Sequence, residues 1–417
     1  MANAGKKTKE GQMALKSIEL FAGAGGLALG TALAGFEGVA AVEWDRWACD
    51  TLEENRDRGF PLLKGLRVAR GDVRQFDYSS VGEGIDLIAG GPPCQPFSLG
   101  GKGRGFNDDR DMFNAYAEAV AALKPRAFII ENVKGLTRQA FANYLQYIEH
   151  RVSMPEIAPK PGELWPDHLR RLERELTSKG DRGVRYSVSR RLYNAADFGA
   201  PQKRERVFFV GFREDQDVHW SFPDPTHGLD ALLRDQWITG DYWDRHKVAK
   251  KDRPALAPMM SRRVETLRRR NDFDGLQPWR TVRDALEGLP EPRKDGREGG
   301  IANHRFQAGA KAYPGHTGSP IDLPSKALKA GDHGVPGGEN MLVRPDGSMR
   351  YFTAREAARM QTFPDGYVFH GAWGETMRQL GNAVPVVLAQ AVAKSVADKL
   401  LTAEMADMVS ARRGRVH

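Results

Sequence analysis

The chain has 417 residues, 41% hydrophobic and 28% charged, which is the balance of an ordinary soluble globular protein with two or three domains. Lysine and arginine outnumber aspartate and glutamate by 62 to 54, and the net charge of +8 suits either a polyanionic partner such as DNA or RNA or a generally basic surface. Two cysteines, Cys49 and Cys94, exclude a disulfide scaffold and favour a reducing compartment. The sequence shows no metal-ligand spacing and no apolar run near the roughly 18 residues of a membrane span, and residues 1–15 predict a basic tail rather than a secretory signal.

The first half of the chain alternates short apolar runs with helical patterns, which is typical of βα units around a mainly parallel sheet. Residues 167–180 combine leucine with charge at helical spacing and predict an amphipathic surface helix. The candidate strands are 17–23, 38–45, 84–91, 126–133, 185–194 and 206–212.

Residues 213–350 hold scattered Trp, Pro, Gly, Arg and His with little periodicity, which predicts a loop-rich second domain. Helical patterning returns at residues 353–364 and 379–401. The predicted fold class is therefore α/β: a large α/β domain, a loop-rich domain inserted late, and a C-terminal helix that packs back on the first domain.

A glycine turn follows the first predicted strand in "IELFAGAGGLALG", where Gly23, Gly25 and Gly26 precede a helical run. Such glycines allow a tight turn and the close approach of a ligand to a helix N-terminus, and Ala28 completes a GxGxxA pattern. Glu43, 20 residues after Gly23, falls where an acidic side chain can accept hydrogen bonds from ribose hydroxyls. The pattern favours an adenosine-bearing cofactor and does not distinguish NAD from S-adenosylmethionine; a glycine turn with an empty crevice remains the alternative.

The stretch "DLIAGGPPCQPFS" places Cys94 just past a strand, at the edge where open α/β sheets bind ligands. Prolines restrict the backbone and would hold the thiol in one orientation. Glu131 ends another apolar strand 37 residues further on, so both side chains could meet in one crevice, where burial would raise the pKa of the carboxyl and let it carry a proton. Taken alone, a cysteine in the position of Cys94 is more often a buried packing residue than a nucleophile, and Glu131 could equally be a carboxylate that caps the next turn.

Six motifs in order, "FAGAGG", "GGPPCQPFS", "ENV", "QKRERVFFVGF", "ARMQTFP" and "QLGNAVP", resemble the motif series of the DNA cytosine-5 methyltransferases of bacterial restriction-modification type. The resemblance extends from about Ser17 to Leu400 with one variable region. It implies a Rossmann-like S-adenosylmethionine-dependent methyltransferase fold with a smaller loop-rich target-recognition domain. The implied boundaries are a basic tail 1–15, a catalytic and cofactor-binding domain 16–224, a target-recognition domain 225–345, a C-terminal segment 346–402 that returns to the catalytic domain, and a tail 403–417.

The resemblance also implies how S-adenosylmethionine is bound. Glu43 would contact the ribose, Trp44 would lie against the adenine, Asp72 would meet the adenine amino group, and Asn382 would lie near the methionine part. Without the resemblance, Asp72 is better interpreted as a simple turn residue. The remaining residues of the implied cofactor site are Phe21, Gly23, Ala24, Gly25, Gly26, Leu27, Val73, Pro93, Phe113 and Ala383.

The implied chemistry starts from the poor nucleophilicity of cytosine C5. Attack of the Cys94 thiolate at C6 would load electrons into the ring, and Glu131 at N3 would stabilise the charge that develops. The activated C5 would take the methyl group, after which loss of the C5 proton and β-elimination would free the cysteine. Arg206, with Arg204 and Gln202 beside it, matches a "QxRxR" element and would hold the cytosine O2.

Double-stranded DNA is the implied partner, and the target base must leave the stack to reach a thiol. Residues 98–111 predict a mobile lid in which Lys102, Arg104 and Arg110 could contact phosphates. In the predicted recognition domain, Ala327-Leu328 stands where family members often carry Thr-Leu. The resemblance further implies a cytoplasmic, nucleoid-associated monomer without membrane contact, and allows a cognate restriction endonuclease in the same cell.

Three alternatives differ in class from a DNA methyltransferase. An NAD-dependent oxidoreductase would share the glycine turn but has no use for "PPCQPFS" with "ENV". A catalytically dead DNA-binding relative is disfavoured because Cys94 and Glu131 are both present. An RNA (tRNA) cytosine-5 methyltransferase of the same family is the closest alternative, and the long loop-rich insertion favours DNA.

Overall fold

The fold is taken from a computed structural model of the chain. It describes residues 14–93, 112–177, 183–270, 275–312, 314, 317–330 and 338–413, and residues 405–413 by their backbone alone. Cys94 and the predicted lid 98–111 therefore lie outside the described residues.

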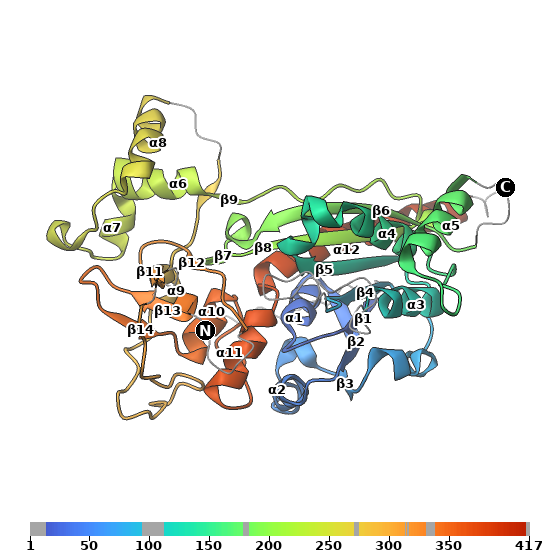
Figure 1. The fold of residues 1–417 in the computed structure, drawn as a ribbon, viewed down its shortest axis with the longest axis horizontal. Coiled ribbons are helices and arrows are strands. Elements are labelled where there is room, and N and C mark those ends of the chain that lie inside the picture. The colour runs from blue at the N-terminus through green and yellow to red at the C-terminus, as the bar shows by residue number, and fades with distance from the viewer. Residues whose placement is uncertain are drawn as a thin grey trace.

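A seven-stranded sheet forms the centre of the larger part of the molecule (Figure 1), in the order β3-β2-β1-β4-β5-β8-β6. The strands are β1 (Leu15–Leu20), β2 (Phe36–Glu43), β3 (Arg67–Arg70), β4 (Leu87–Gly90), β5 (Ala127–Val133), β6 (Tyr186–Asn194) and β8 (Glu205–Arg213). Pairing is parallel from β3 to β5, whereas β8 runs antiparallel to both of its neighbours. The predicted α/β class with a mainly parallel sheet is confirmed. The sequence missed β3, because its four residues, RVAR, include two arginines and form no apolar run.

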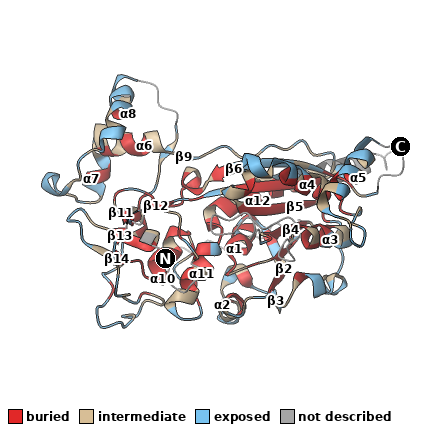
Figure 2. Ribbon diagram, viewed as in Figure 1, coloured by how far each residue is buried: buried red, intermediate tan, exposed pale blue. Residues whose placement is uncertain are grey.

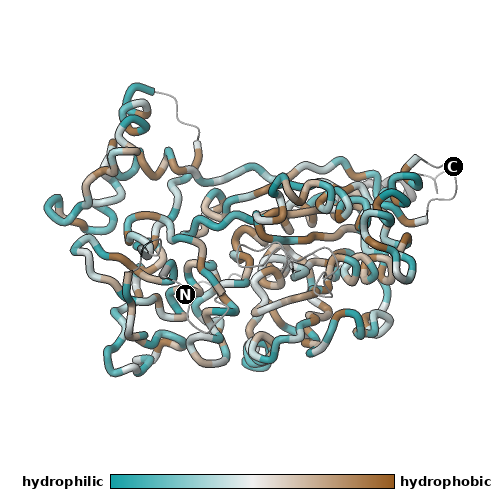
Figure 3. The backbone as a smooth tube through the Cα atoms, in the orientation of Figure 1, coloured by the Kyte–Doolittle hydropathy of each residue, from teal (hydrophilic) through white to brown (hydrophobic). Residues whose placement is uncertain are grey.

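Helices cover both faces of the sheet, which explains why its strands are apolar on both sides. Alternate residues of β8 enter different cores: Val207 and Phe209 pack with one face, and Phe208 and Val210 with the other. The first face is covered by α3 (Phe113–Leu123), α4 (Ala142–Ser153) and α5 (Trp165–Thr177), the second by α1 (Gly26–Leu33) and α12 (Val386–Arg413). Buried residues accordingly gather in the sheet and the helices against it (Figure 2), and the strands are among the hydrophobic stretches of the chain (Figure 3).

The glycines of the first turn serve helix packing as well as the turn itself. Gly25 has φ 85°, a conformation that side chains rarely adopt, and it immediately precedes α1. A Cβ at Gly26 would overlap the carbonyl oxygen of Val384, and one at Gly30 would overlap Ala389. The small residues therefore let α1 and the start of α12 approach closely, as the predicted return of the C-terminal helix requires.

The C-terminal segment contains three helices: α10 (Ala354–Met360), α11 (Trp373–Asn382) and α12. Thr353 starts α10 through a capping box with Glu356. The pattern at 379–401 predicted one helix, whereas the structure has two. Helix α11 ends at Asn382 and α12 begins at Val386, because Pro385 between them has no backbone N–H to continue the hydrogen bonds of α11. Within the described residues, the stretch Trp373–Glu404 is apolar and long enough to cross a membrane, but 61% of its most apolar window is buried inside the protein, as in the core helix of a soluble protein.

The variable region is less irregular than its sequence indicates. A small helical unit lies at the upper left of Figure 1. It consists of α6 (Leu229–Arg234), a π-helical turn (Asp235–Thr239), α7 (Asp241–Arg245) and α8 (Pro258–Arg269). Its core is Leu232, Tyr242 and Trp243, packed against Trp237 and Trp279. These aromatic residues follow no helical period along the chain, which is why the pattern suggested loops. The remaining elements are short: α9 (Val282–Leu286) and strands β7 (Gln202–Lys203), β9 (His227–Gly228), β10 (Gln277–Pro278), β11 (Ser319–Pro320), β12 (Ser325–Lys326), β13 (Met341–Val343) and β14 (Met349–Tyr351); α2 (Arg46–Asp57) belongs to the first domain.

Candidate active site

The carboxyl ends of β1, β4 and β5 bring three of the singled-out segments together. Because β4 pairs in parallel with both neighbours, Leu20 lies opposite Gly90, and Gly90 opposite Ile130. A Cβ at Gly90 would lie 2.6 Å from the Leu20 carbonyl oxygen, so only glycine fits this crossing point. The turn after β1, the start of the proline turn after β4, and Glu131 therefore share one edge of the sheet.

Glu131 is a buried carboxyl held in an ion pair. Its Oε1 lies 2.7 Å from Arg206 Nε, and the two side chains are only 9% and 13% exposed. Burial raises the pKa of Glu131, and the positive charges of Arg206 and Arg204 oppose that rise. A Cβ at Gly91 would lie 3.0 Å from the second carboxyl oxygen, so the proline turn passes directly beside the acid. The Glu131 carboxyl therefore lies next to the segment that leads to Cys94.

Asn132 is a residue of this edge that the sequence analysis did not single out. Its side-chain amide donates to the carbonyl oxygen of Pro92 at 2.9 Å and accepts from the backbone N–H of Val133 at 2.8 Å. It therefore holds the proline turn against β5. Its position in "ENV", directly after Glu131, was the only feature of the sequence that could have indicated this role.

Gln202 and Arg204 point elsewhere than Arg206. Both are buried, with 0% and 1% exposure, and both form hydrogen bonds to backbone groups of the variable and C-terminal segments. Of the three residues predicted to act together, Arg206 is the one that forms the ion pair with Glu131.

Glu43 closes the predicted cofactor turn. Its carboxylate accepts hydrogen bonds from the backbone N–H groups of Gly23 at 2.7 Å, Trp44 at 2.8 Å and Asp45 at 2.7 Å. Burial raises its pKa, and these three donors oppose the rise. A carboxylate can accept about four hydrogen bonds, so room for one further donor remains.

The backbone of this turn has unusual conformations. Gly23 has φ 53°, and among the described residues other than its two chain neighbours no atom lies within 4 Å of where a Cβ would be; Phe21 also has a positive φ of 55°. Trp44 is 78% exposed, an unusual exposure for a large aromatic side chain. Asp72 lies close to Glu43, because the N–H of the preceding residue, Gly71, donates to Glu43 O at 2.9 Å.

Asp72 has a partner of its own. It caps the short 3₁₀-helix Val73–Gln75 and forms an ion pair with Arg74, which lowers the pKa of its carboxyl. The alternative interpretation of Asp72 as a turn residue therefore describes its contacts in this structure. Its side chain is 19% exposed.

Most of the other residues of the predicted cofactor site are buried. Those with 9% exposure or less are Ala24, Gly25, Gly26, Leu27, Val73, Phe113 and Ala383. Val73 and Phe113 belong to the core under the sheet. Asn382 and Pro93 are exposed, and Asn382 lies beside the glycine turn because its neighbour Ala383 is within 3.4 Å of the Cβ position of Gly26.

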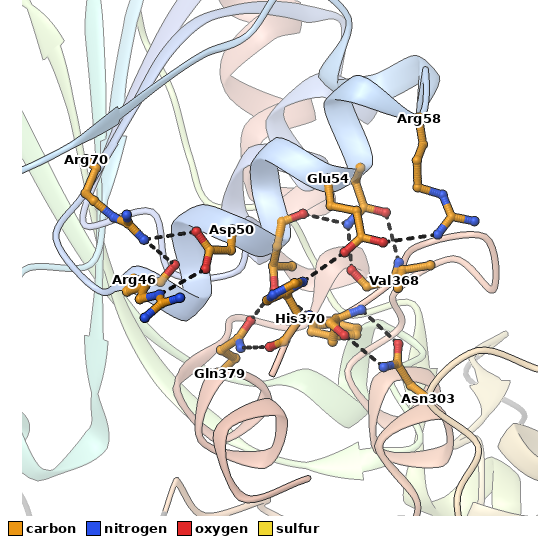
Figure 4. A network of polar contacts seen from close by, with 12 residues as sticks. Arg46, Asp50, Glu54, Arg58, Arg70, Asn303, Val368, His370 and Gln379 are labelled. Carbon is orange, nitrogen blue, oxygen red and sulfur yellow. Dashed lines mark hydrogen bonds and ion pairs between the residues drawn. The ribbon is translucent and has the colours of Figure 1, made fainter. Parts of the chain in front are cut away.

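A polar network joins α2 to the C-terminal segment (Figure 4). Thr51 donates to Gln379 at 2.8 Å, and the Asn55 side chain donates to Val368 O at 2.6 Å while accepting from Val368 N at 2.9 Å. At the start of α2, Asp45 pairs with Arg378 at 2.8 Å. The partners are more than 300 residues apart in sequence, and together they fix the Glu43–Asp45 loop relative to α11.

The glycine turn also contacts the C-terminal segment, through a hydrogen bond that the sequence did not predict. The Tyr367 hydroxyl donates to Ala24 O at 2.8 Å. Cys49 lies under Glu43, where its thiol donates to Glu43 O at 3.2 Å. Burial raises the pKa of Cys49 to about 12, which disfavours its thiolate form at neutral pH. Among the described residues, no group of His, Cys, Asp and Glu is arranged to hold a metal ion.

Comparison with known proteins shows which protein family has this sequence and fold. Residues 15–153 and 166–398 match the model of the family described as C-5 cytosine-specific DNA methylase. Type II methyltransferase M.PspPI of Psychrobacter sp. (strain TA137) is 30% identical over 381 residues, covering 91% of this chain and 78% of that protein. Type II methyltransferase M.Eco47II of Escherichia coli is 30% identical over 383 residues, with coverage of 91% and 78%.

Solved structures agree on the fold. The crystal structure of the S. pombe Dnmt2 methyltransferase aligns with a TM-score of 0.52 at 16% identity, covering 93% of this chain and 98% of that one. The predicted methyltransferase fold and the predicted restriction-modification type are both confirmed. The chain therefore belongs to the C-5 cytosine-specific DNA methylase family and is a DNA cytosine methyltransferase.

Proposed function

We propose that the chain methylates C5 of a cytosine flipped out of duplex DNA, through a transient bond between Cys94 Sγ and cytosine C6. One observation carries the proposal: the buried Glu131–Arg206 pair lies directly beside the proline turn that leads to Cys94. A proton donor and a cation are thus held where an extruded pyrimidine would meet the thiol.

Each residue of the pair has a separate task. Attack by sulfur at C6 pushes the ring electrons towards N3, and the Glu131 carboxyl donates a proton or a short hydrogen bond there. Burial raises the pKa of this carboxyl, which favours the acid form that can donate. Arg206 would bind the cytosine O2 and steady the carboxyl in the same contact. After the methyl group has been added, the C5 proton passes to water, its electron pair forms the C5–C6 double bond, and the sulfur leaves C6 as a thiolate. A proton that N3 has taken from Glu131 returns to the carboxylate, which restores the neutral ring.

Cys94 is the nucleophile by a chemical argument. The sequence has two cysteines, and Cys49 is buried under Glu43 with a pKa of about 12. A thiol that stays protonated at neutral pH cannot attack C6. Asn132 anchors the turn two residues before Cys94 in the chain, because its side chain donates to Pro92 O.

S-Adenosylmethionine would supply the electrophilic methyl group when bound. The residues present fit it: Glu43 accepts three hydrogen bonds and has capacity for a fourth from a ribose hydroxyl, the exposed Trp44 ring offers a stacking face, and no described residue beyond the chain neighbours of Gly23 lies within 4 Å of a Cβ there. Asp72 would meet the adenine amino group only if its bond to Arg74 leaves a carboxyl oxygen available. Asn382, exposed beside the glycine turn, would contact the methionine part.

The partner is double-stranded DNA, and the net charge of +8 supports phosphate contacts. Residues 225–345 would read the target sequence, and the rest of the chain, 16–224 with 346–402, would carry catalysis. We further propose a cytoplasmic monomer whose cell contains a cognate restriction endonuclease.

The experiment has two arms. Bisulfite sequencing of DNA from cells that express the chain should reveal a methylated site, and purified enzyme should transfer labelled methyl groups to duplex DNA but not to tRNA. Duplexes with 5-fluorocytosine at that site should trap a covalent complex, because fluorine cannot leave C5 as a cation. The matched control is Cys94→Ala, which should bind cofactor and trap nothing. Methylation of tRNA alone would refute the DNA substrate, and a fully active Cys94→Ala enzyme would refute the covalent route.

A further inference from the structure

Arg204 is a charged side chain placed where charge is costly. It is 1% exposed, and burial holds the pKa of its guanidinium below the usual value. Its two terminal nitrogens donate to carbonyl oxygens of two distant segments: Nη1 to Leu328 O at 3.0 Å, and Nη2 to Gly381 O at 2.5 Å. The planar fork of arginine can span two such acceptors at once.

Gln202 holds the same leucine from its other side. Its Oε1 accepts from Leu328 N–H at 3.0 Å, and its Nε2 donates to Met360 O at 3.3 Å. The backbone N–H and the C=O of Leu328 are therefore both bound by side chains of the "QKRER" motif. Just before this point, β7 and β12 pair in parallel, with Ser325 opposite Gln202.

The gripped segment also packs tightly against the C-terminal segment. A Cβ at Gly381 would overlap the backbone of Ala330, so the two chains touch without side chains between them. Asn340 binds both backbone groups of Lys329 at 3.1 Å. Leu328 itself is buried in the core formed with α10 and α11. Residues 327–330 thus have little freedom to move.

In this segment Ala327-Leu328 stands where family members often carry Thr-Leu, and the segment lies within the variable region 225–345 that would read DNA. Gly381, the other residue that Arg204 holds, directly precedes Asn382. One buried side chain therefore connects the predicted recognition domain with the residue before Asn382. Arg206 is the member of the "QKRER" motif that forms the ion pair with Glu131, whereas the hydrogen bonds of Gln202 and Arg204 run to backbone groups of other segments.

We propose that Gln202 and Arg204 are positioning residues for target recognition rather than catalytic residues: they clamp Leu328 against Gly381 so that the predicted recognition domain, residues 225–345, meets DNA in one register. The inference rests on the proposed DNA methylation. Loosening the clamp should weaken DNA binding and site discrimination, while the Glu131–Arg206 ion pair remains formed. Because the charge of Arg204 also opposes the raised pKa of Glu131, the Gln202 variants separate positioning from that electrostatic effect.

The test compares four variants in steady-state methylation. Arg204→Met and Gln202→Met each remove one arm of the clamp. Arg204→Lys and Gln202→Glu keep part of it, since lysine can reach one carbonyl and glutamate can still accept from Leu328 N–H. For each enzyme, kcat and the KM for DNA are measured on the cognate duplex and on duplexes with one changed base pair.

Arg151→Met is the matched control. Arg151 is also fully buried and also donates to a backbone carbonyl, Pro155 O, at 2.8 Å, but it lies in α4, away from the clamp. A general loss of stability should affect it as much as the clamp variants. It should leave the KM for DNA and the discrimination between duplexes unchanged.

We expect a KM for DNA about tenfold or more above the wild-type value in Arg204→Met, the range for losing a charge-assisted hydrogen bond, and about three- to tenfold above it in Gln202→Met, whose lost hydrogen bonds are neutral. Discrimination should fall, kcat should stay within about threefold, and Lys and Glu should recover part of the loss. If Arg204→Met does not fold, Gln202→Met decides. A fall in kcat with unchanged KM and discrimination would make these residues catalytic and overturn the proposal; wild-type enzyme that methylates no DNA would instead refute the proposed function.

Discussion

Arg206→Met isolates the value of the ion pair at the candidate active site. The substitution keeps most of the side-chain volume and leaves the Glu131 carboxyl buried without its cation, whose Nε lies 2.7 Å away in the wild type. Opposite charges whose centres are roughly 4 Å apart attract by about 4 kcal/mol at an effective dielectric constant of about 20. Removing one partner of a buried pair typically costs about 3–5 kcal/mol. We therefore expect a loss of about 3–5 kcal/mol in the free energy of unfolding near pH 8.

The loss should depend on pH with a defined sign. Burial already raises the pKa of Glu131 in the wild type, and loss of the arginine charge raises it further. A carboxyl with a raised folded-state pKa binds more protons in the folded state, so stability falls as pH rises above its unfolded pKa of about 4.3. At pH 5 the variant can protonate Glu131 and recover part of its stability.

Chemical denaturation at pH 5 and pH 8 measures both effects, and the double variant Arg206→Met/Glu131→Gln is the control. Without a carboxylate to strand, the double variant should be more stable at pH 8 than Arg206→Met and should show little of its pH dependence. A cost below about 1 kcal/mol at pH 8, or a double variant no more stable than the single one, would refute the view that the pair is a coupled, buried unit.

Three further predictions concern single residues. Asn132→Ala removes the donor to Pro92 O, so kcat should fall about tenfold or more while calorimetric titration shows unchanged affinity for S-adenosylhomocysteine; wild-type kcat would exclude its role in holding the turn. Trp44→Ala should weaken cofactor affinity about three- to tenfold and leave the unfolding midpoint unchanged, because the ring is 78% exposed; equal affinity would exclude a stack on adenine. Glu19 is fully buried, its Oε2 has no hydrogen-bond partner among the described residues, and burial raises the pKa of its carboxyl. The free energy of unfolding of the wild type relative to Glu19→Gln should therefore fall from pH 5 to pH 8. A difference that does not change with pH in denaturant titrations would contradict the raised pKa of Glu19.

Much of the central fold followed from local patterns. Buried strands covered on both faces are nearly continuous apolar runs, and the runs at residues 126–133 and 206–212 predicted β5 and β8 for this reason. The pattern failed for β3, a short strand with two arginines, and for the helical unit around Tyr242 and Trp243, whose core residues follow no regular spacing. It also joined α11 and α12 into one helix across Pro385.

The sequence by itself determined the order of motifs, the βα alternation and the family, because these depend on residue types and on spacing along the chain. Only the tertiary structure decided which member of "QKRER" meets Glu131, since that depends on the antiparallel register of β5 and β8. It also decided that Gln202 and Arg204 bind Leu328, more than 120 residues away. Buried polar groups take whichever partners the packed chain brings within hydrogen-bond distance, and no local pattern encodes those partners.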